Sequence, residues 1–188
     1  MFKRSKGYFL LTMLVLTGFA GRIQSDTLSG KERRTLLKEL KTSKTGLAES
    51  IAGLNSQQLN FKPAKGQLSI KECIYKLAAA ENELWITANL ALQRKADIKK
   101  TILQDEALTA AISSDKLSKI KEPNFRSIKE AMKLYRKNRN QMQKFVNTST
   151  ENARRHIAPT SFGNFDVYQI LLLNTIISNE YMEEIEKI

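Results

Sequence analysis

The sequence contains very few of the residues that bind transition metals. Its 188 residues include one histidine, His156, and one cysteine, Cys73. Zinc, nickel, copper and iron sites usually draw on several imidazole or thiolate ligands, so this composition excludes most of them. A site made only of carboxylates would favour magnesium or calcium. A single cysteine also cannot form a disulfide within the chain, so stability must come from burial of apolar side chains.

Residues that interrupt helices are scarce as well. The chain has only three prolines and eight glycines. Its apolar residues recur at spacings of three and four rather than two, which indicates helices rather than strands. We therefore expect an all-α protein.

The start of the chain predicts a secretory signal peptide. Three basic residues among the first six precede an apolar run over residues 8–16 and small residues before position 21. Cleavage can follow Ala20 or Ser25. A membrane-spanning helix needs about 20 apolar residues, and this run is shorter. We predict a signal peptide over residues 1–25, a folded domain over residues 26–188, export to the periplasm or extracellular space, and no stable membrane insertion after cleavage.

The chain is strongly basic. Removing residues 1–20 takes away three basic residues and no acidic one, so the formal net charge falls from +12 to +9. Such a charge favours polyanions in general. However, the basic residues are scattered among 19 acidic ones, which is typical of a well-hydrated surface. No basic stripe with interleaved aromatic residues is found, and we expect no nucleic-acid partner.

Four long amphipathic segments predict the architecture. Three helix starts carry a serine followed three residues later by a glutamate, the spacing of a capping box: Ser29 with Glu32, Ser69 with Glu72, and Ser127 with Glu130. The irregular stretch 93–122 predicts a long crossover with short helical pieces between the second and third helices. A short helical turn at residues 154–156 precedes a fourth helix, expected from about Phe165 to the end. A four-helix bundle is the natural packing of these segments.

Two stretches resemble the DinB-like superfamily. The first covers the entry to the second helix and its first turns, and the second covers the entry to the last helix and its end. The matching residues are Leu59-Asn60-Phe61-Lys62-Pro63-Ala64, Leu68-Ser69-Ile70-Lys71-Glu72-Cys73-Ile74-Tyr75-Lys76-Leu77-Ala78, Ala80-Glu81, His156, Pro159, Ser161-Phe162-Gly163, Phe165-Asp166-Val167-Tyr168-Gln169, Leu171-Leu172-Leu173 and Glu184-Ile185-Glu186. The resemblance implies a four-helix bundle of the DinB-like type over nearly the whole mature chain.

The resemblance also implies where a metal site would lie. In that family three histidines, one on the second helix and two on the last, hold a divalent metal that several groups use to activate a thiol. Here these positions fall on Lys76, Ile177 and Tyr181. Isoleucine has no lone pair, a lysine ammonium has only donors, and a tyrosine is neutral unless its pKa is lowered. We therefore predict no metal and no other cofactor.

Two interpretations of these positions remain open. In one, the Lys76 ammonium and the Tyr181 hydroxyl, with Asn174 and Ser178 nearby, form a metal-free pocket for an anionic small molecule. In the other, Glu72 pairs with Lys76 in the favourable helical order, and the two residues on the last helix only fill space.

His156 is a candidate general base flanked by two arginines, but it has no identifiable carboxylate partner or nucleophile, so we interpret it as a loop or capping residue. We predict an exported, non-catalytic small-ligand-binding or envelope protein with a degenerate metal site. The alternative is a metal-dependent thiol transferase-like enzyme that uses non-histidine ligands. The resemblance also allows a homodimer, because bundles of this family often pair.

Overall fold

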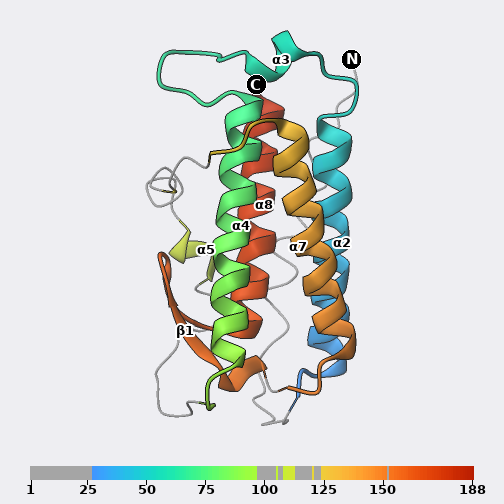
Figure 1. Cartoon of the computed structure of the whole chain (residues 1–188), viewed down its shortest axis with the longest axis vertical. Coiled ribbons are helices and arrows are strands. Elements are labelled where there is room, and N and C mark those ends of the chain that lie inside the picture. The colour runs from blue at the N-terminus through green and yellow to red at the C-terminus, as the bar shows by residue number, and fades with distance from the viewer. Residues whose placement is uncertain (1–26, 97–104, 106–107, 113–119, 121–123, 152) are drawn as a thin grey trace.

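The computed structural model describes residues 27–96, 105, 108–112, 120, 124–151 and 153–188. Four long helices form a bundle (Figure 1). They are α2 (Gly30–Ser50), α4 (Ile70–Leu92), α7 (Ile128–Thr148) and α8 (Val167–Lys187). The predicted helical bundle is confirmed.

Local hydrogen bonds explain where these helices begin. The side chains of Ser29 and Ser69 each accept a hydrogen bond from the backbone amide of the glutamate three residues on. The side chain of each glutamate accepts a hydrogen bond from the backbone amide of the serine. Ser127 accepts from the amide of Glu130 in the same way. Such bonds satisfy amides that have no partner inside the helix. All three predicted starts are therefore confirmed.

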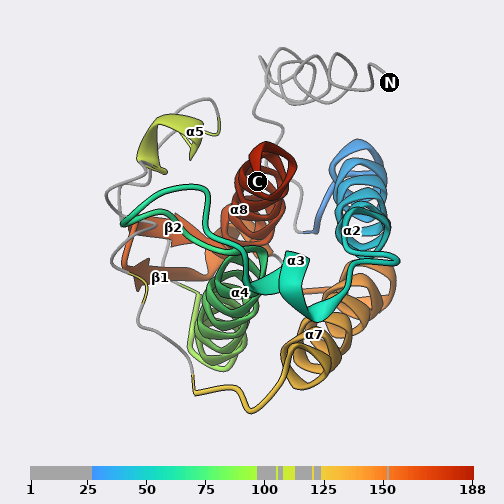
Figure 2. The same cartoon turned by 90° about the horizontal axis from the view of Figure 1, so that it is seen from above.

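The helices are not packed in chain order. α2 and α8 run in one direction and α4 and α7 in the other (Figure 1). α2 packs mainly on α7 and α8, and α4 packs mainly on the same two helices. Seen from above, α2 and α4 therefore occupy opposite corners of the bundle (Figure 2). The apolar core lies between the four helices and includes Leu36, Leu40, Leu77, Leu84, Met142, Leu173 and Ile177.

A β-hairpin precedes the last helix, and the sequence analysis did not predict it. It consists of β1 (Ile157–Thr160) and β2 (Gly163–Asp166), which pair antiparallel after a short 3-10 turn, η2 (Ala153–Arg155). The hydroxyl of Thr160 accepts from the amides of Phe162 and Gly163 and closes the turn. α8 consequently begins at Val167 rather than near Phe165, with Asp166 as its cap. Two four-residue strands are too short for an alternating apolar pattern to mark them.

Two further short helices connect the bundle, α3 (Ser56–Asn60) and α5 (Leu108–Ala111). α5 is one helical piece of the predicted crossover, most of which lies outside the described residues. The predicted signal peptide lies outside them too. Within the described residues, no helix combines the length and the apolar character needed to cross a membrane.

Candidate functional site

The three positions that the resemblance assigned to metal ligands are buried, one on α4 and two on α8. Lys76 on α4 is only 7% exposed, and its Nζ donates to the backbone carbonyl of Ile120 at 3.1 Å. Ile177 and Tyr181 lie one turn apart on α8 and are 1% and 4% exposed. Their burial removes water as a competing partner, so the chemistry of these side chains decides what the site can hold.

Cys73 lies beside this group in the core. Burial, together with the negative charges of Glu184 and Glu72, raises the pKa of the thiol to about 12, although Lys76 acts in the opposite direction. Burial also raises the pKa of Tyr181, and Cys73 adds to that shift. The Tyr181 hydroxyl has no hydrogen-bond partner among the described residues. At neutral pH both groups are therefore uncharged.

These residues do not suit a divalent metal. Thiolate and phenolate bind cations, whereas the protonated thiol of Cys73 and the phenol of Tyr181 are poor ligands. The Lys76 ammonium repels a cation, and Ile177 offers no donor. Across the described ranges of the chain, no group of three or more His, Cys, Asp or Glu side chains is arranged to hold a metal ion.

The other two predicted pocket residues, Asn174 and Ser178, face a buried arginine on α7. Arg139 is fully buried, and its guanidinium donates to the Ser178 hydroxyl at 2.5 Å and to the backbone carbonyl of Asn174 at 2.9 Å. The same guanidinium donates to Ser43 of α2 at 2.9 Å. The Ser178 side chain therefore belongs to a polar network around Arg139, whereas the Asn174 side chain donates to the backbone carbonyl of Ile170, and its Oδ1 has no hydrogen-bond partner among the described residues. No hydrogen bond in the described part of the chain joins either side chain to Lys76 or Tyr181.

Glu81 on α4 completes this network, which the sequence analysis missed. Its carboxylate lies 2.5 Å from Arg139 Nε, and both side chains are 0% exposed. Burial raises the pKa of Glu81 to about 7, while Arg139 opposes the shift. The available signal was that Glu81 and Arg139 both occupy inward positions of their helices, four residues after Leu77 and Tyr135 respectively.

Glu72 forms an ion pair with Lys62 and not, as predicted, with Lys76. Glu72 lies 2.6 Å from Nζ of Lys62, in the loop before α4, and accepts from the amide of Ser69. These bonds lower the pKa of Glu72 despite some desolvation. The Glu72 carboxylate therefore links the α3–α4 loop to the start of α4.

His156 links the hairpin to the bundle. Its Nδ1 lies 3.1 Å from the carbonyl of Ala91, at the end of α4, and its backbone carbonyl accepts from the amide of Val167. A carboxylate is nearby after all, because Nε2 lies 3.9 Å from Glu151. No nucleophile contacts the ring among the described residues, and these contacts agree with the predicted capping role.

Arg154 forms an ionic cluster at the same end of the bundle. Its guanidinium contacts Glu32 at 2.8 Å, Asp105 at 2.6 Å and Asp166 at 3.2 Å, and lies 3.8 Å from the ring centre of Tyr168. These residues come from α2, the crossover and the start of α8. The cluster therefore links three distant parts of the chain, and this stabilising role accounts for its buried charges.

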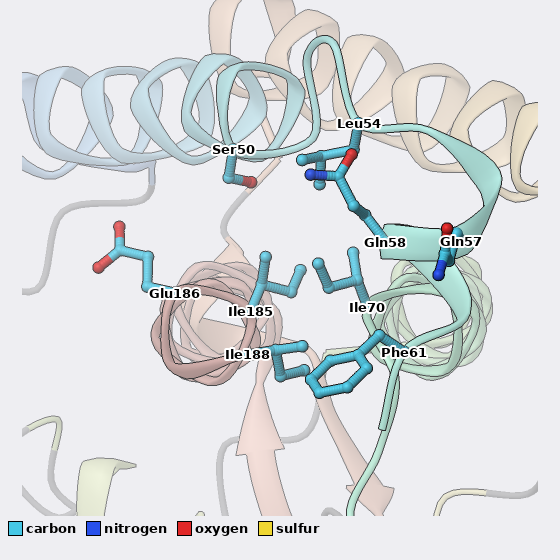
Figure 3. Close-up of a pocket in the computed structure, with 9 residues that line it drawn as sticks. All are labelled: Ser50, Leu54, Gln57, Gln58, Phe61, Ile70, Ile185, Glu186 and Ile188. Atoms are coloured by element: carbon cyan, nitrogen blue, oxygen red, sulfur yellow. The ribbon is translucent and has the colours of Figure 1, made fainter. Parts of the chain in front are cut away.

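A pocket of about 480 Å³ opens at the opposite end of the bundle. It lies between the end of α2, α3, the start of α4 and the end of α8 (Figure 3). The side chains of Ile70 and Ile185 point toward each other across it, and Phe61 lies beside Ile188. Its other lining residues are Ser50, Leu54, Gln57, Gln58 and Glu186. The pocket is mainly apolar, with amide groups on the α3 side.

Comparison with known proteins identifies the architecture. No protein-family model and no curated protein matches the sequence. A solved structure is similar to the fold of this chain: YfiT from Bacillus subtilis, described as a probable metal-dependent hydrolase with an unusual four-helix bundle topology. The match has a TM-score of 0.62 and covers 90% of each chain at 13% sequence identity.

The fold is a four-helix bundle similar to that of YfiT. At 13% identity the likeness to YfiT concerns the fold alone. The activity described for YfiT belongs to that protein, and function in this chain has to be argued from its own side chains.

Proposed function

We propose that the chain is an exported, metal-free bundle of the DinB-like fold that binds a small molecule without catalysing a reaction. The observation that carries the proposal is the chemistry at the three family ligand positions. Lys76 supplies an ammonium, Ile177 a hydrocarbon and Tyr181 a neutral phenol, and all three are buried. Export rests on the signal-like residues 1–25, and cell fractionation with and without them tests it.

The end pocket is the proposed ligand site. Its volume of about 480 Å³ lies in the range of small-molecule sites, roughly 300–1,000 Å³. Aliphatic and aromatic lining residues favour a ligand with an apolar body, and the amides of Gln57 and Gln58 can orient a polar group on it. The alternative anion site at Lys76 has less support, because its ammonium already donates to Ile120 and because Asn174 and Ser178 bond to other groups.

A metal-dependent thiol transferase-like enzyme would need ligands other than histidine. Glu32, Asp105 and Asp166 lie together in the described part of the chain, and Arg154 forms an ion pair with each of them. Bound between these carboxylates, the guanidinium takes the place that a cation would need. No described group therefore favours this alternative.

Metal content tests the non-metal proposal. We expect the purified protein, incubated with zinc, nickel or iron and then desalted, to retain no stoichiometric metal by inductively coupled plasma mass spectrometry. The matched variant Lys76→His, Ile177→His and Tyr181→His restores imidazoles at the three positions, and we expect it to retain zinc or nickel. Stoichiometric metal in the unmodified protein would contradict the proposal.

Filling the end pocket tests the ligand site. Leu54→Trp places a larger side chain in the pocket, and we expect it to weaken binding of a neutral, environment-sensitive apolar dye by at least about tenfold, or about 1.4 kcal/mol. Leu90→Trp is the matched control, because Leu90 is 48% exposed on α4 and lies outside the pocket. Equal loss in both variants, or none in Leu54→Trp, would place dye binding elsewhere. Fluorescence titration gives both affinities.

A further inference from the structure

The tertiary structure concentrates positive charge on one side of the bundle. α2 and α7 together hold twelve basic and four acidic residues, a formal charge of +8. α4 and α8 together hold three basic and seven acidic residues, a formal charge of −4. α2 and α7 pack side by side, on the side away from the β-hairpin (Figure 2). The charges that are scattered along the sequence are therefore separated in space.

The charge of α2 and α7 is presented to solvent. Their exposed basic residues, which we call the basic face, are Lys31, Arg34, Lys38, Lys41, Lys129, Lys133, Arg136, Lys137 and Lys144. A bond of 2.7 Å from Lys44 to Asn140 joins the two helices within this surface. The eight members of the basic face other than Lys31 form no salt bridge with a described residue.

Acidic residues interrupt the basic face only at one end. The two exposed ones on these helices are Glu49, near the end of α2, and Glu130, near the start of α7. Because α2 and α7 run in opposite directions, both lie at the same end of the bundle. Each helix has 21 residues and is therefore about 30 Å long, so most of that length carries positive charge alone.

The composition of the face limits what can bind it. The large apolar side chains exposed in the described residues are Phe61, Ile86 and Leu90, and none lies on α2 or α7. Without exposed aromatic rings the face cannot stack bases, which single-stranded nucleic-acid sites require. Without apolar side chains it cannot insert into a bilayer. Binding must therefore be electrostatic and sensitive to salt.

We propose that the basic face docks on the anionic phosphate headgroups of a membrane surface. The basic residues of α2 and α7 form two adjacent rows, and a planar array of headgroups can contact both rows at once. A single linear polyanion would contact only one row. Anionic leaflets attract basic clusters in this way without insertion. The proposal agrees with the expected export of the chain, but the vesicle assay below tests the face whether or not the protein is exported and whether or not the end pocket binds a ligand.

The test measures co-sedimentation of the full chain with vesicles of phosphatidylcholine, with or without phosphatidylglycerol. The face variant is Lys38→Glu, Lys41→Glu, Lys133→Glu and Lys137→Glu. The matched control carries the same change in net charge elsewhere, as Lys65→Glu, Arg94→Glu, Lys95→Glu and Lys187→Glu, all at exposed positions. Circular dichroism and thermal unfolding establish that both variants are folded.

We expect binding only to vesicles with phosphatidylglycerol, and we expect it to weaken as salt rises. The face variant should bind at least about tenfold more weakly than the unmodified protein, and the control within about twofold of it. Equal loss in both variants would show that only net charge matters, and equal binding to pure phosphatidylcholine would show apolar attachment. Tighter binding to double-stranded DNA than to the anionic vesicles at the same salt would assign the face to another partner. Any of these three results overturns the proposal.

Discussion

Replacing Arg139 by methionine should lower the free energy of unfolding by about 3 to 5 kcal/mol. The substitution leaves the Glu81 carboxylate fully buried with no cation beside it. It also removes the donor that Ser43 and Ser178 share. Urea unfolding followed by circular dichroism at constant pH measures the loss of unfolding free energy. The slope of the transition shows whether the substitution has also changed the unfolded state.

The double variant Glu81→Met and Arg139→Met is the control for this prediction. Replacing both members of a buried ion pair by apolar side chains of similar volume is often neutral or stabilising. We therefore expect the double variant to recover most of the stability that Arg139→Met loses. Equal loss in the single and the double variant would mean that packing around Arg139, rather than its charge, is responsible.

The loss in Arg139→Met should depend on pH. In the folded protein burial raises the pKa of Glu81 from 4.5 to about 7. A carboxyl group with a raised folded pKa stabilises the fold fully below its unfolded pKa and loses that contribution as the pH rises through the folded value. Removing Arg139 raises the pKa of Glu81 further, so the variant should be closest to the unmodified protein near pH 5 and furthest from it near pH 8. Destabilisation that is the same at both values would contradict this assignment.

Replacing Arg154 by methionine should have the second largest effect, about 2 to 4 kcal/mol. The guanidinium contacts three carboxylates, of which that of Asp166 is 0% exposed. Burial raises the pKa of Asp166 to about 7, and Arg154 opposes this shift. Without Arg154, ionised Asp166 is buried with no cation, and three parts of the chain lose their common partner. Urea unfolding again measures the change.

Two variants test the cause of the Arg154 effect. Asp166→Asn removes the buried charge but keeps an oxygen that can cap α8, so it should recover part of the loss when combined with Arg154→Met. Arg155→Met is the matched control, because Arg155 is exposed and surface ion pairs contribute less than about 1 kcal/mol. As with Glu81, the loss should grow from pH 5 to pH 8. If Arg155→Met were as destabilising as Arg154→Met, the cluster would not be its origin.

The candidate site stays a prediction. The choice of Lys76, Ile177 and Tyr181 follows from helical spacing together with the family resemblance, and the structure buries all three side chains, the first on α4 and the other two on α8. The hydrogen bonds that Arg139 donates to the Asn174 backbone carbonyl and the Ser178 hydroxyl could not be predicted, because Arg139 is 35 and 39 residues away from them in the sequence. The end pocket could not be predicted either, since four separate elements build it.

The sequence by itself determined the four long helices and the starts of the first three. Capping at Ser29, Ser69 and Ser127 and apolar spacing along each helix depend on residues a few positions apart, so one segment contains all the information required. Only the tertiary structure decided that Glu81 meets Arg139 and that the basic residues of α2 and α7 share one side. The first result depends on α4 packing beside α7. The second depends on α2 packing beside α7 rather than beside α4, the next long helix in the chain. Packing of the apolar faces over long sequence separations sets that choice, and no local pattern encodes it.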